Sequence, residues 1–373
     1  MQKDIPSLFA RLERPRVLIL ALSGIGNLLM ASPLFRALQN ANPTAEIDLV
    51  VSSRGTKGVI EANPRIRQVF VGSAKPSFSA FRKLVATVRQ ERPTIGIVTH
   101  PGQLITSAGL LFFSRIPRRI GHRYSWMMLR NSSFLLTDPV SLLPLPPLEH
   151  ALSTRIAHDV VQNLQLLEPL GITPDPFAAR YEFPLTTDDR ARADAWLMKH
   201  TLGNRTLIGM HPGSHGDLAY KRWPAERFAA LGDQLAASHN ASFLVCGGTE
   251  EQTLKTEVSA RMRARSVVVD TPLRVTAALI ARCAFFVSND SGLMHIAASQ
   301  NIPTFGLFGP TDERRTAPWG PHGHVIRAAG TQPTYEVSRL QRLRGQRGTD
   351  PSLLALSVDA VIKHISVREV SRS

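Results

Sequence analysis

The chain has 373 residues, 43% hydrophobic and 20% charged, which suits two folded domains and excludes extensive disorder. Two cysteines, Cys246 and Cys283, are too few for a disulfide framework or a four-ligand zinc site and suit a reducing compartment. The N-terminus shows no secretion signal and the apolar runs are shorter than a membrane span, so we expect a cytoplasmic protein.

The net charge of +15 is concentrated in the first half of the chain. Between Val50 and Leu135 there are 14 Lys or Arg residues and two acids, Glu61 and Glu91. This charge could bind nucleic acid, an anionic membrane surface or a phosphorylated substrate. Alternatively, it forms a generally basic, solvated surface that has no partner. No nucleic-acid recognition module is visible, and aromatic residues do not interleave with the basic ones, so we expect no nucleic-acid partner.

Apolar runs and helical segments alternate through the first half at intervals of about 30 residues, the pattern of parallel α/β architecture. We expect strands over residues 16–22, 47–51 and 95–98 and helices over residues 31–41 and 151–170. The last of these helices is stopped by Gly171 and Pro174.

A proline-rich stretch over residues 174–184 marks the expected boundary between domains 1–180 and 181–373. The C-terminal helix belongs to the second domain or packs back on the first. After the boundary we expect strands over 206–210, 242–246, 266–269, 284–288 and 304–308, and helices over 225–238, 251–263, 274–282 and 292–299. The chain is therefore predicted to form two doubly wound sheets in tandem, with ligands bound after the strands and in a cleft between the domains.

The clearest motif follows the strand expected over 284–288 and runs Asn-Asp-Ser-Gly-Leu-Met-His. Asp290 or Ser291 can cap the next helix, whose first N–H groups and dipole favour a phosphate. Gly292 allows close approach of a ligand, and His295, one turn on, could donate to a phosphate or sugar hydroxyl. An ordinary capped helix with a partly buried histidine is the alternative.

A second motif runs from His211-Pro212-Gly213-Ser214 to Lys221-Arg222-Trp223-Pro224. Lys221 stands just before a helix, where a cation is unfavourable unless an anion such as a diphosphate offsets it. Ser214 could supply a further donor.

Two more glycine turns follow expected strands. After Gly247-Gly248, Glu250 or Glu251 could accept from ribose hydroxyls, or could simply enrich a helix start in acids. The turn Gly24-Ile25-Gly26-Asn27 is neither a dinucleotide fingerprint nor a Walker motif, and we expect it to face the second domain across the cleft.

Taken together, these motifs resemble the family of ADP-heptose:lipopolysaccharide heptosyltransferases, glycosyltransferase family nine. The likeness spans roughly residues 16–328 and includes the stretches Phe308-Gly309-Pro310-Thr311-Asp312 and Arg315-Thr316-Ala317-Pro318. It implies a GT-B fold, an α/β architecture of two Rossmann-like domains facing across a cleft, and inverting transfer of heptose from ADP-heptose to the lipopolysaccharide inner core.

The resemblance also implies roles for individual residues. Lys221 would pair with the donor phosphates, and the phosphate and sugar site would be lined by Asp290, Ser291, Gly292 and His295. Glu250 or Glu251 would hold the nucleoside. No metal and no cofactor are expected, since the ADP-sugar is a substrate and no acidic pair with metal-ligand spacing follows the relevant strands.

Asn27 departs from the family pattern, which has an aspartate here as the base that deprotonates the acceptor. An amide can position the acceptor hydroxyl but cannot take its proton. Another group then takes the proton, with His100 and His122 as candidates, or acceptor activation differs, or activity is weak or altered.

The expected acceptor is a lipid-linked anionic glycan at the inner face of the cytoplasmic membrane, where the protein would be peripheral. Gly26 and four arginines, Arg65, Arg67, Arg118 and Arg119, are expected to bind its Kdo carboxylates and phosphates. The stretch 134–148 could dip into that surface or simply pack. Three alternatives stay open: a transferase of another nucleotide sugar, a sugar-nucleotide epimerase, and a sugar-nucleotide-binding protein with a degenerate site.

Overall fold

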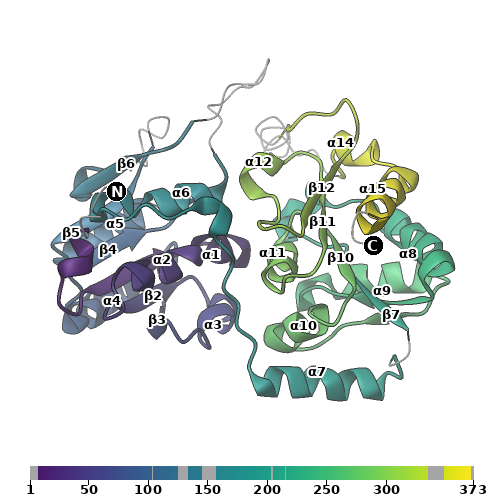
Figure 1. Ribbon diagram of the computed structural model, residues 1–373, viewed down its shortest axis with the longest axis horizontal. Coiled ribbons are helices and arrows are strands. Elements are labelled where there is room, and N and C mark those ends of the chain that lie inside the picture. Colours follow the sequence, from purple (N-terminus) through teal and green to yellow (C-terminus); the bar gives the residue numbers. More distant parts are fainter. Residues whose placement is uncertain are drawn as a thin grey trace, which may run out of the picture. The chain divides into compact units, whose positions relative to one another are not determined.

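The computed structural model describes residues 7–102, 104–124, 133–144, 157–202, 205–214, 216–334 and 348–370. The chain forms two compact units, Met1–Pro184 and Leu185–Ser373 (Figure 1). The division lies at the end of the proline-rich stretch, four residues beyond the expected 180/181 boundary.

The first unit is built on a six-stranded parallel sheet with the order β3-β2-β1-β4-β5-β6. Its strands are β1 Arg16–Ala21, β2 Glu46–Val51, β3 Ile66–Val71, β4 Ile95–Val98, β5 Arg118–Arg123 and β6 Asp138–Ser141. Its α-helices are α1 Ile25–Ala31, α2 Pro33–Ala41, α3 Arg54–Ile60, α4 Phe78–Glu91, α5 Leu104–Phe113 and α6 Asp159–Gln165, with short 3-10 helices η1 Phe9–Arg11, η2 Ser133–Leu135, η3 Glu168–Leu170 and η4 Pro176–Ala178.

The second unit contains a second six-stranded parallel sheet, in the order β12-β11-β10-β7-β8-β9. Its strands are β7 Thr206–His211, β8 Ala241–Val245, β9 Ser266–Val268, β10 Phe285–Asn289, β11 Thr304–Phe308 and β12 Gly323–Arg327. Its helices are α7 Thr187–Lys199, η5 Gly216–Lys221, α8 Ala225–His239, η6 Thr249–Glu251, α9 Gln252–Arg261, α10 Leu273–Ile280, α11 Gly292–Ser299, α12 Glu313–Thr316, α14 Pro351–Leu354 and α15 Val358–Val370.

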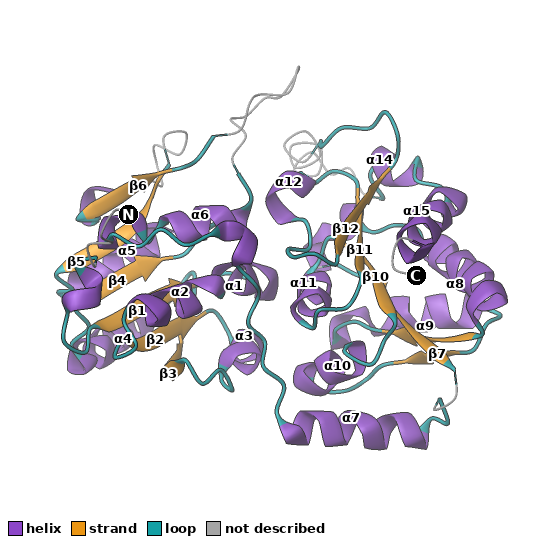
Figure 2. Cartoon of the chain, viewed as in Figure 1, coloured by secondary structure: helices purple, strands orange, loops and turns teal. Residues whose placement is uncertain are grey.

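Counted from its own first strand, the second sheet has the same strand order as the first. In each, helices lie on both faces (Figure 2), and the chain direction across the sheet reverses once, between β1 and β4 and between β7 and β10. Loops after the two strands at such a switch point separate and leave room for a ligand. The carboxyl ends of β1, β4, β7 and β10 are therefore where functional residues are expected.

Both faces of these sheets are buried, because the central strands are apolar at nearly every position. Every residue of β4 and of β8 is buried. The core of the second unit includes Ile208, Phe243 and Val287. The C-terminal helix α15 belongs to this unit, where Val361 and Ile365 are buried in the same core.

Two expected helices were wrong in extent. The helix predicted over 31–41 is α2, which begins at Pro33, and Ala31 is the last residue of α1, a separate helix that was not predicted. The helix predicted over 151–170 begins only at Asp159 and ends at Gln165; residues 151–156 lie outside the described part of the chain.

Candidate functional site

The residues that cluster most closely lie at the switch point of the second sheet. His211 is the last residue of β7, which lies between β8 and β10. The loops that follow these two neighbours carry Glu251 and Ser291, so the topology brings all three to one edge.

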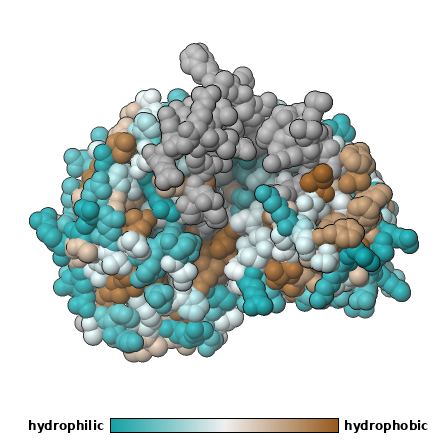
Figure 3. All heavy atoms as spheres, turned by 180° about the vertical axis from the view of Figure 1, so that it is seen from behind, coloured by the Kyte–Doolittle hydropathy of each residue, from teal (hydrophilic) through white to brown (hydrophobic). Residues whose placement is uncertain are grey.

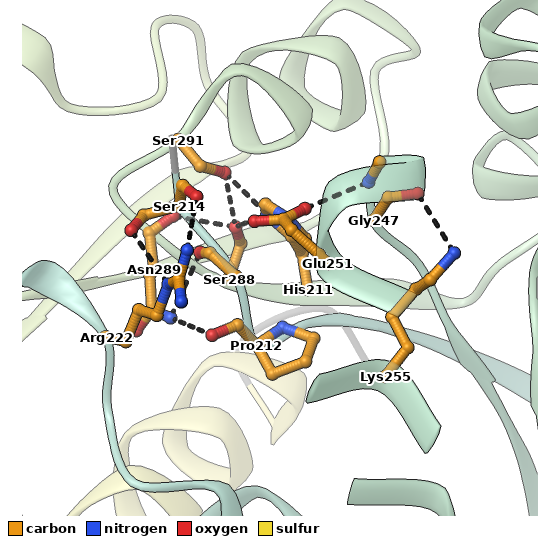
Figure 4. Close-up of polar contacts among 12 residues, drawn as sticks. His211, Pro212, Ser214, Arg222, Gly247, Glu251, Lys255, Ser288, Asn289 and Ser291 are labelled. Atoms are coloured by element: carbon orange, nitrogen blue, oxygen red, sulfur yellow. Dashed lines mark hydrogen bonds and ion pairs between the residues drawn. The ribbon is translucent and has the colours of Figure 1, made fainter. Parts of the chain in front are cut away.

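The imidazole of His211 bridges the other two side chains (Figure 4). Its Nε2 lies 2.9 Å from Oε2 of Glu251, and its Nδ1 lies 2.8 Å from Oγ of Ser291. A neutral imidazole serves both partners when Nε2–H donates to the carboxylate and Nδ1 accepts from the hydroxyl. His211 therefore connects the loops after β8 and β10 through one ring.

Glu251 is the better placed of the two candidate glutamates, because its carboxylate is buried and held while Glu250 is exposed. Burial raises the pKa of Glu251, but the hydrogen bond and charge of His211, together with the N–H of Gly248 and the charge of Arg222, outweigh it, and the pKa is lowered. Oε2 also accepts from the N–H of Gly248 at 2.9 Å, whereas the buried Oε1 has no hydrogen-bond partner among the described residues. An ionised oxygen of this kind is suited to accept from a ligand hydroxyl.

Gly213 makes room for that oxygen. A Cβ atom at this position would lie 1.9 Å from Oε1 of Glu251, so any other residue would displace the carboxylate. The glycine after His211-Pro212 is thus required by the position of the neighbouring carboxylate.

Ser291 rather than Asp290 caps α11: its hydroxyl accepts from the N–H of Met294. The same hydroxyl lies 3.0 Å from Oγ of Ser288 and accounts for the His211 contact. Gly292 is the first residue of α11 and is partly exposed, so the N–H groups at the start of this helix are near solvent.

Lys221 has an anionic partner within the chain. Its Nζ lies 2.8 Å from Oδ2 of Asp290, and both side chains are mostly buried. Burial raises the pKa of Asp290, but the charge and hydrogen bond of Lys221 outweigh it, so the pKa is lowered. The buried His295 and the hydroxyl of Thr311 act in the same direction. The sequence prediction that an anion offsets Lys221 is met here by Asp290.

Ser214 and Arg222 stabilise the loop between β7 and α8. The hydroxyl of Ser214 donates to the carbonyl of Leu218 at 2.8 Å, and Arg222 donates to the carbonyl of Ser214 at 3.0 Å. Because Ser214 is buried and its proton is used within the loop, the geometry favours a structural contribution over direct contact with a ligand.

Asn289 is a site residue that the sequence analysis left without a role. Its Oδ1 accepts from the N–H of Trp223 at 3.0 Å, and its Nδ2 donates to the carbonyl of Pro212 at 2.8 Å. This fully buried amide fixes both ends of the Ser214–Lys221 loop to β10. Its position in the Asn-Asp-Ser-Gly motif, directly before Asp290, was the feature of the sequence that could have identified it.

In the first unit, Gly26 and Asn27 lie in the first turn of α1, at the carboxyl edge of the sheet beside its switch point. Both are partly exposed. This is the edge at which a ligand is expected.

The four arginines assigned to the acceptor lie instead at the amino edge of that sheet, just before or within the first residues of β3 and β5. Arg65 donates to Glu182 at 3.1 Å, and Arg67 pairs with Asp48 and with Glu91, the latter at 2.7 Å. Each of them neutralises an acid or caps backbone carbonyls of its own unit.

The remaining two arginines behave in the same way. Arg118 pairs with Asp138 at 3.0 Å, and Arg119 donates to the carbonyls of Leu135 and Ile116, each at 2.7 Å. All four positions therefore favour structural roles over contact with an acceptor.

The two histidines named as alternative bases are buried. His122 directs its ring nitrogens at the carbonyls of Val140 and Gln162, 3.3 and 2.9 Å away. Burial, aided by the charge of His100, lowers the pKa of His122 to about 4. Nδ1 of His100 lies 2.8 Å from the hydroxyl of Tyr124, and its Nε2 lies 3.4 Å from Asp159. Direct contact of either ring with an acceptor is not favoured by this burial.

Among the described residues, no three His, Cys, Asp or Glu side chains are grouped so as to hold a metal ion. Within the same residues, no helix has the length and apolar character needed to cross a membrane.

Comparison with known proteins supplies the context for this site. A sequence model described as "Glycosyltransferase family 9 (heptosyltransferase)" matches residues 81–346. Lipopolysaccharide heptosyltransferase 2 of Salmonella typhimurium is 26% identical over 323 residues, which cover 84% of this chain and 88% of that protein. Lipooligosaccharide heptosyltransferase 2 of Haemophilus ducreyi is 25% identical over 368 residues, covering 94% and 98%.

Solved structures share the fold over nearly the whole chain. The E. coli ADP-heptose lps heptosyltransferase II superposes with a TM-score of 0.74 at 23% identity, covering 96% of this chain and 99% of that one. A glycosyl transferase family 9 protein from Veillonella parvula gives a TM-score of 0.72 at 23% identity, covering 96% and 97%. The two parallel sheets are therefore those of the GT-B fold.

Proposed function

This chain belongs to glycosyltransferase family 9, the heptosyltransferases, and is an enzyme, and we propose that it transfers heptose from ADP-heptose to the inner core of lipopolysaccharide, with inversion at the sugar. The observation that carries the donor part of this proposal is the buried Oε1 of Glu251, ionised and without a partner among the described residues, beside the switch point of the second sheet. A ribose hydroxyl could donate the hydrogen bond that Oε1 of Glu251 does not receive from the described residues.

The diphosphate of the donor would lie at the start of α11. Backbone N–H groups there are near solvent, and the helix dipole favours an anion. Lys221 is held near this helix start by its ion pair with Asp290. When a diphosphate is bound, the ammonium of Lys221 can donate to it as well as to Asp290, since it has three N–H groups. Donor charge is then stabilised by protein groups, and no bound metal is invoked.

Asn27 would lie beside the acceptor and orient its hydroxyl through hydrogen bonds. Its amide cannot accept the hydroxyl's proton, so proton removal falls to another group or to water. This one substitution is the reason to retain a second candidate function, a sugar-nucleotide-binding protein with a degenerate transferase site. A transferase of another nucleotide sugar shares the same donor geometry.

The acceptor we propose is a lipid-linked anionic glycan, met at the inner face of the cytoplasmic membrane by a peripheral protein. Cationic residues do lie at the carboxyl edge of the first sheet. Arg54 and Lys57 follow β2 in α3, and Arg123 ends β5, with both arginines exposed. These three replace the four arginines of the amino edge as the groups that would meet Kdo carboxylates and core phosphates.

Calorimetry with ADP and UDP tests the donor assignment. We expect ADP to bind the intact protein without added Mg²⁺. UDP should bind at least about tenfold more weakly, because the proposed donor substrate is an ADP-sugar. Tight UDP binding without ADP binding would identify a different nucleotide sugar. Binding of neither nucleotide would remove the proposed donor site.

A further inference from the structure

The first unit exposes large apolar side chains on two adjacent helices. α4 and α5 pack against each other, and α5 also contacts η2. The α4–α5 surface, as we name it, consists of side chains with these exposed fractions: Phe78 77%, Ile105 57%, Phe112 45%, Phe113 53% and, on η2, Phe134 82%. Hydrophobic residues that reach the outside of the molecule between hydrophilic ones are visible in the space-filling view (Figure 3).

The core of the unit does not account for these exposed residues. α5 contributes Ala108, Leu110 and Leu111 to the core, while Ile105 and Phe112, seven positions apart, lie on its outer side. The outer side of a surface helix is normally polar. α5 has no charged residue along its length, so it is apolar on both sides.

The aromatic rings are held by one another and by arginines. Phe113 packs edge-on against Phe81 and Phe112, with ring centroids 6.1 and 5.4 Å apart. The guanidinium of Arg82 lies over Phe78 at 5.8 Å, and that of Arg119 lies over Phe112 at 5.7 Å. The rings are thus fixed in exposed positions with cations beside them.

The charge around this surface is almost entirely positive. Residues 72–117 contain one acid, Glu91, which already pairs with Arg67. The same stretch has six basic residues, all exposed: Lys75, Arg82, Lys83, Arg89, Arg92 and Arg115. Exposed apolar side chains bordered by Lys and Arg are the features with which a helix lies in the interface of an anionic bilayer.

We propose that the α4–α5 surface is where this protein docks on an anionic lipid bilayer, with the exposed phenylalanines and Ile105 entering the headgroup boundary. A second copy of the chain is the less suitable occupant, because a two-fold interface would set the same six cations against each other. The inference builds on the proposed lipid-linked acceptor by naming the surface that meets the lipid, but its evidence comes from α4 and α5 and not from the donor site.

Co-sedimentation with vesicles tests the proposal. The intact protein should bind phosphatidylethanolamine vesicles that contain phosphatidylglycerol and should not bind phosphatidylcholine vesicles. Phe78→Ser with Ile105→Ser should weaken binding at least about tenfold, since two largely exposed apolar side chains lose their contact with lipid. Phe177→Ser, which alters a residue 84% exposed on η4, is the matched control and should leave binding unchanged.

Charge reversal gives an independent measurement. Lys75→Glu with Lys83→Glu should weaken binding about tenfold, and the matched pair Lys199→Glu with Lys363→Glu, exposed in the second unit, should change it much less. Thermal melting and the single variant Phe78→Ser separate loss of the surface from loss of the fold.

Three results would overturn the proposal. These are failure of the intact protein to bind the anionic vesicles, binding that survives the Phe78 and Ile105 changes, and self-association that those changes abolish while vesicle binding persists. The last would make the surface a dimer interface. ADP binding is measured separately, so a protein that binds ADP but no vesicles refutes this inference alone, and the converse refutes the proposed donor.

Discussion

Lys221 shows how a mostly buried cation is neutralised in the proposed donor site. The ammonium of Lys221 is neutralised by Asp290 before any ligand arrives, so removing either partner leaves the other as an unpaired buried charge. A loss of activity in a single variant would therefore mix a binding effect with a stability effect. The two are separated by changing both residues.

We expect Lys221→Ala to weaken ADP binding about ten- to hundredfold, because a charge-assisted contact with phosphate is lost. It should also lower thermal stability through the orphaned Asp290. The double change Lys221→Ala with Asp290→Asn should recover most of the stability and none of the lost affinity, as measured by calorimetry and melting. Equal ADP affinity in the parent and Lys221→Ala would remove this lysine from the donor site.

The two ring nitrogens of His211 make separate contacts, and substitutions can remove them one at a time. An asparagine side chain reaches only the position of Nδ1, and a glutamine side chain only that of Nε2. His211→Gln should keep the contact with Glu251 and lose that with Ser291, and His211→Asn should do the reverse. Each lost hydrogen bond is worth about 0.5–1.5 kcal/mol, or roughly two- to tenfold in affinity.

Adenosine and ADP affinities measured on both variants distinguish the two halves of the bridge. Adenosine binding should fall more in His211→Asn, whereas the additional affinity that ADP gains from its diphosphate should fall more in His211→Gln. If both variants lose affinity equally and in proportion to their loss of stability, His211 supports the fold and does not position the site.

The residues proposed for the donor site could be singled out from the sequence because they follow strands. Asp290, Ser291, Gly292 and Glu251 follow apolar runs whose ends can be read from the sequence. Their partners could not be predicted, since pairing of Lys221 with Asp290 or of His211 with Glu251 depends on which strands are neighbours. The placement of the four arginines at the amino edge could not be predicted, because charge density along the chain does not show which edge of a sheet a residue occupies.

On the scale of secondary-structure elements, His122 joins three of them. It lies on β5, and its ring faces the carbonyls of Val140 on β6 and Gln162 on α6. The ring is buried, and the same burial holds its pKa near 4. The folded state thus keeps this histidine neutral at a pH at which an unfolded chain would protonate it.

Stability should therefore fall as the pH is lowered. Below about pH 6.5 the unfolded state binds a proton that folded His122 does not, so the free energy of unfolding decreases down to about pH 4, by up to about 3 kcal/mol. Denaturant titrations at several pH values check this, with His122→Gln expected to flatten the slope between pH 6.5 and 5. An identical slope in that variant would assign the pH dependence to other groups.

Two of the strands that were not predicted, β5 and β12, share one cause. β5 has the sequence Arg-Arg-Ile-Gly-His-Arg and β12 the sequence Gly-His-Val-Ile-Arg, so neither is a continuous apolar run. Their charged residues are accommodated by acids and carbonyls from elements distant in sequence, such as Asp138 for Arg118 and Glu313 for Arg327. Tertiary pairing overrides the local pattern at these strands.

At the scale of the whole molecule, the same strand order occurs twice, and each copy holds a different part of the proposed chemistry. The family resemblance, the GT-B fold and the heptosyltransferase class predicted from the motifs are confirmed by the comparisons. The proposed division assigns the sugar nucleotide to the second unit and the acceptor to the first. The residue on which this account depends most is Asn27, because it alone departs from the expected catalytic pattern.

The proposed heptosyltransferase activity is best tested by comparing heptose transfer by the parent protein and by Asn27→Asp, measured as product formed from ADP-heptose and a lipopolysaccharide inner-core acceptor. The account predicts that the parent transfers heptose and that Asn27→Asp equals or exceeds it, by about 10²-fold if proton removal limits the rate. A parent that binds ADP but transfers nothing, with transfer appearing only in Asn27→Asp, would show a degenerate site. Transfer of heptose by neither protein, although both bind ADP and remain folded, would contradict the proposed heptosyltransferase activity.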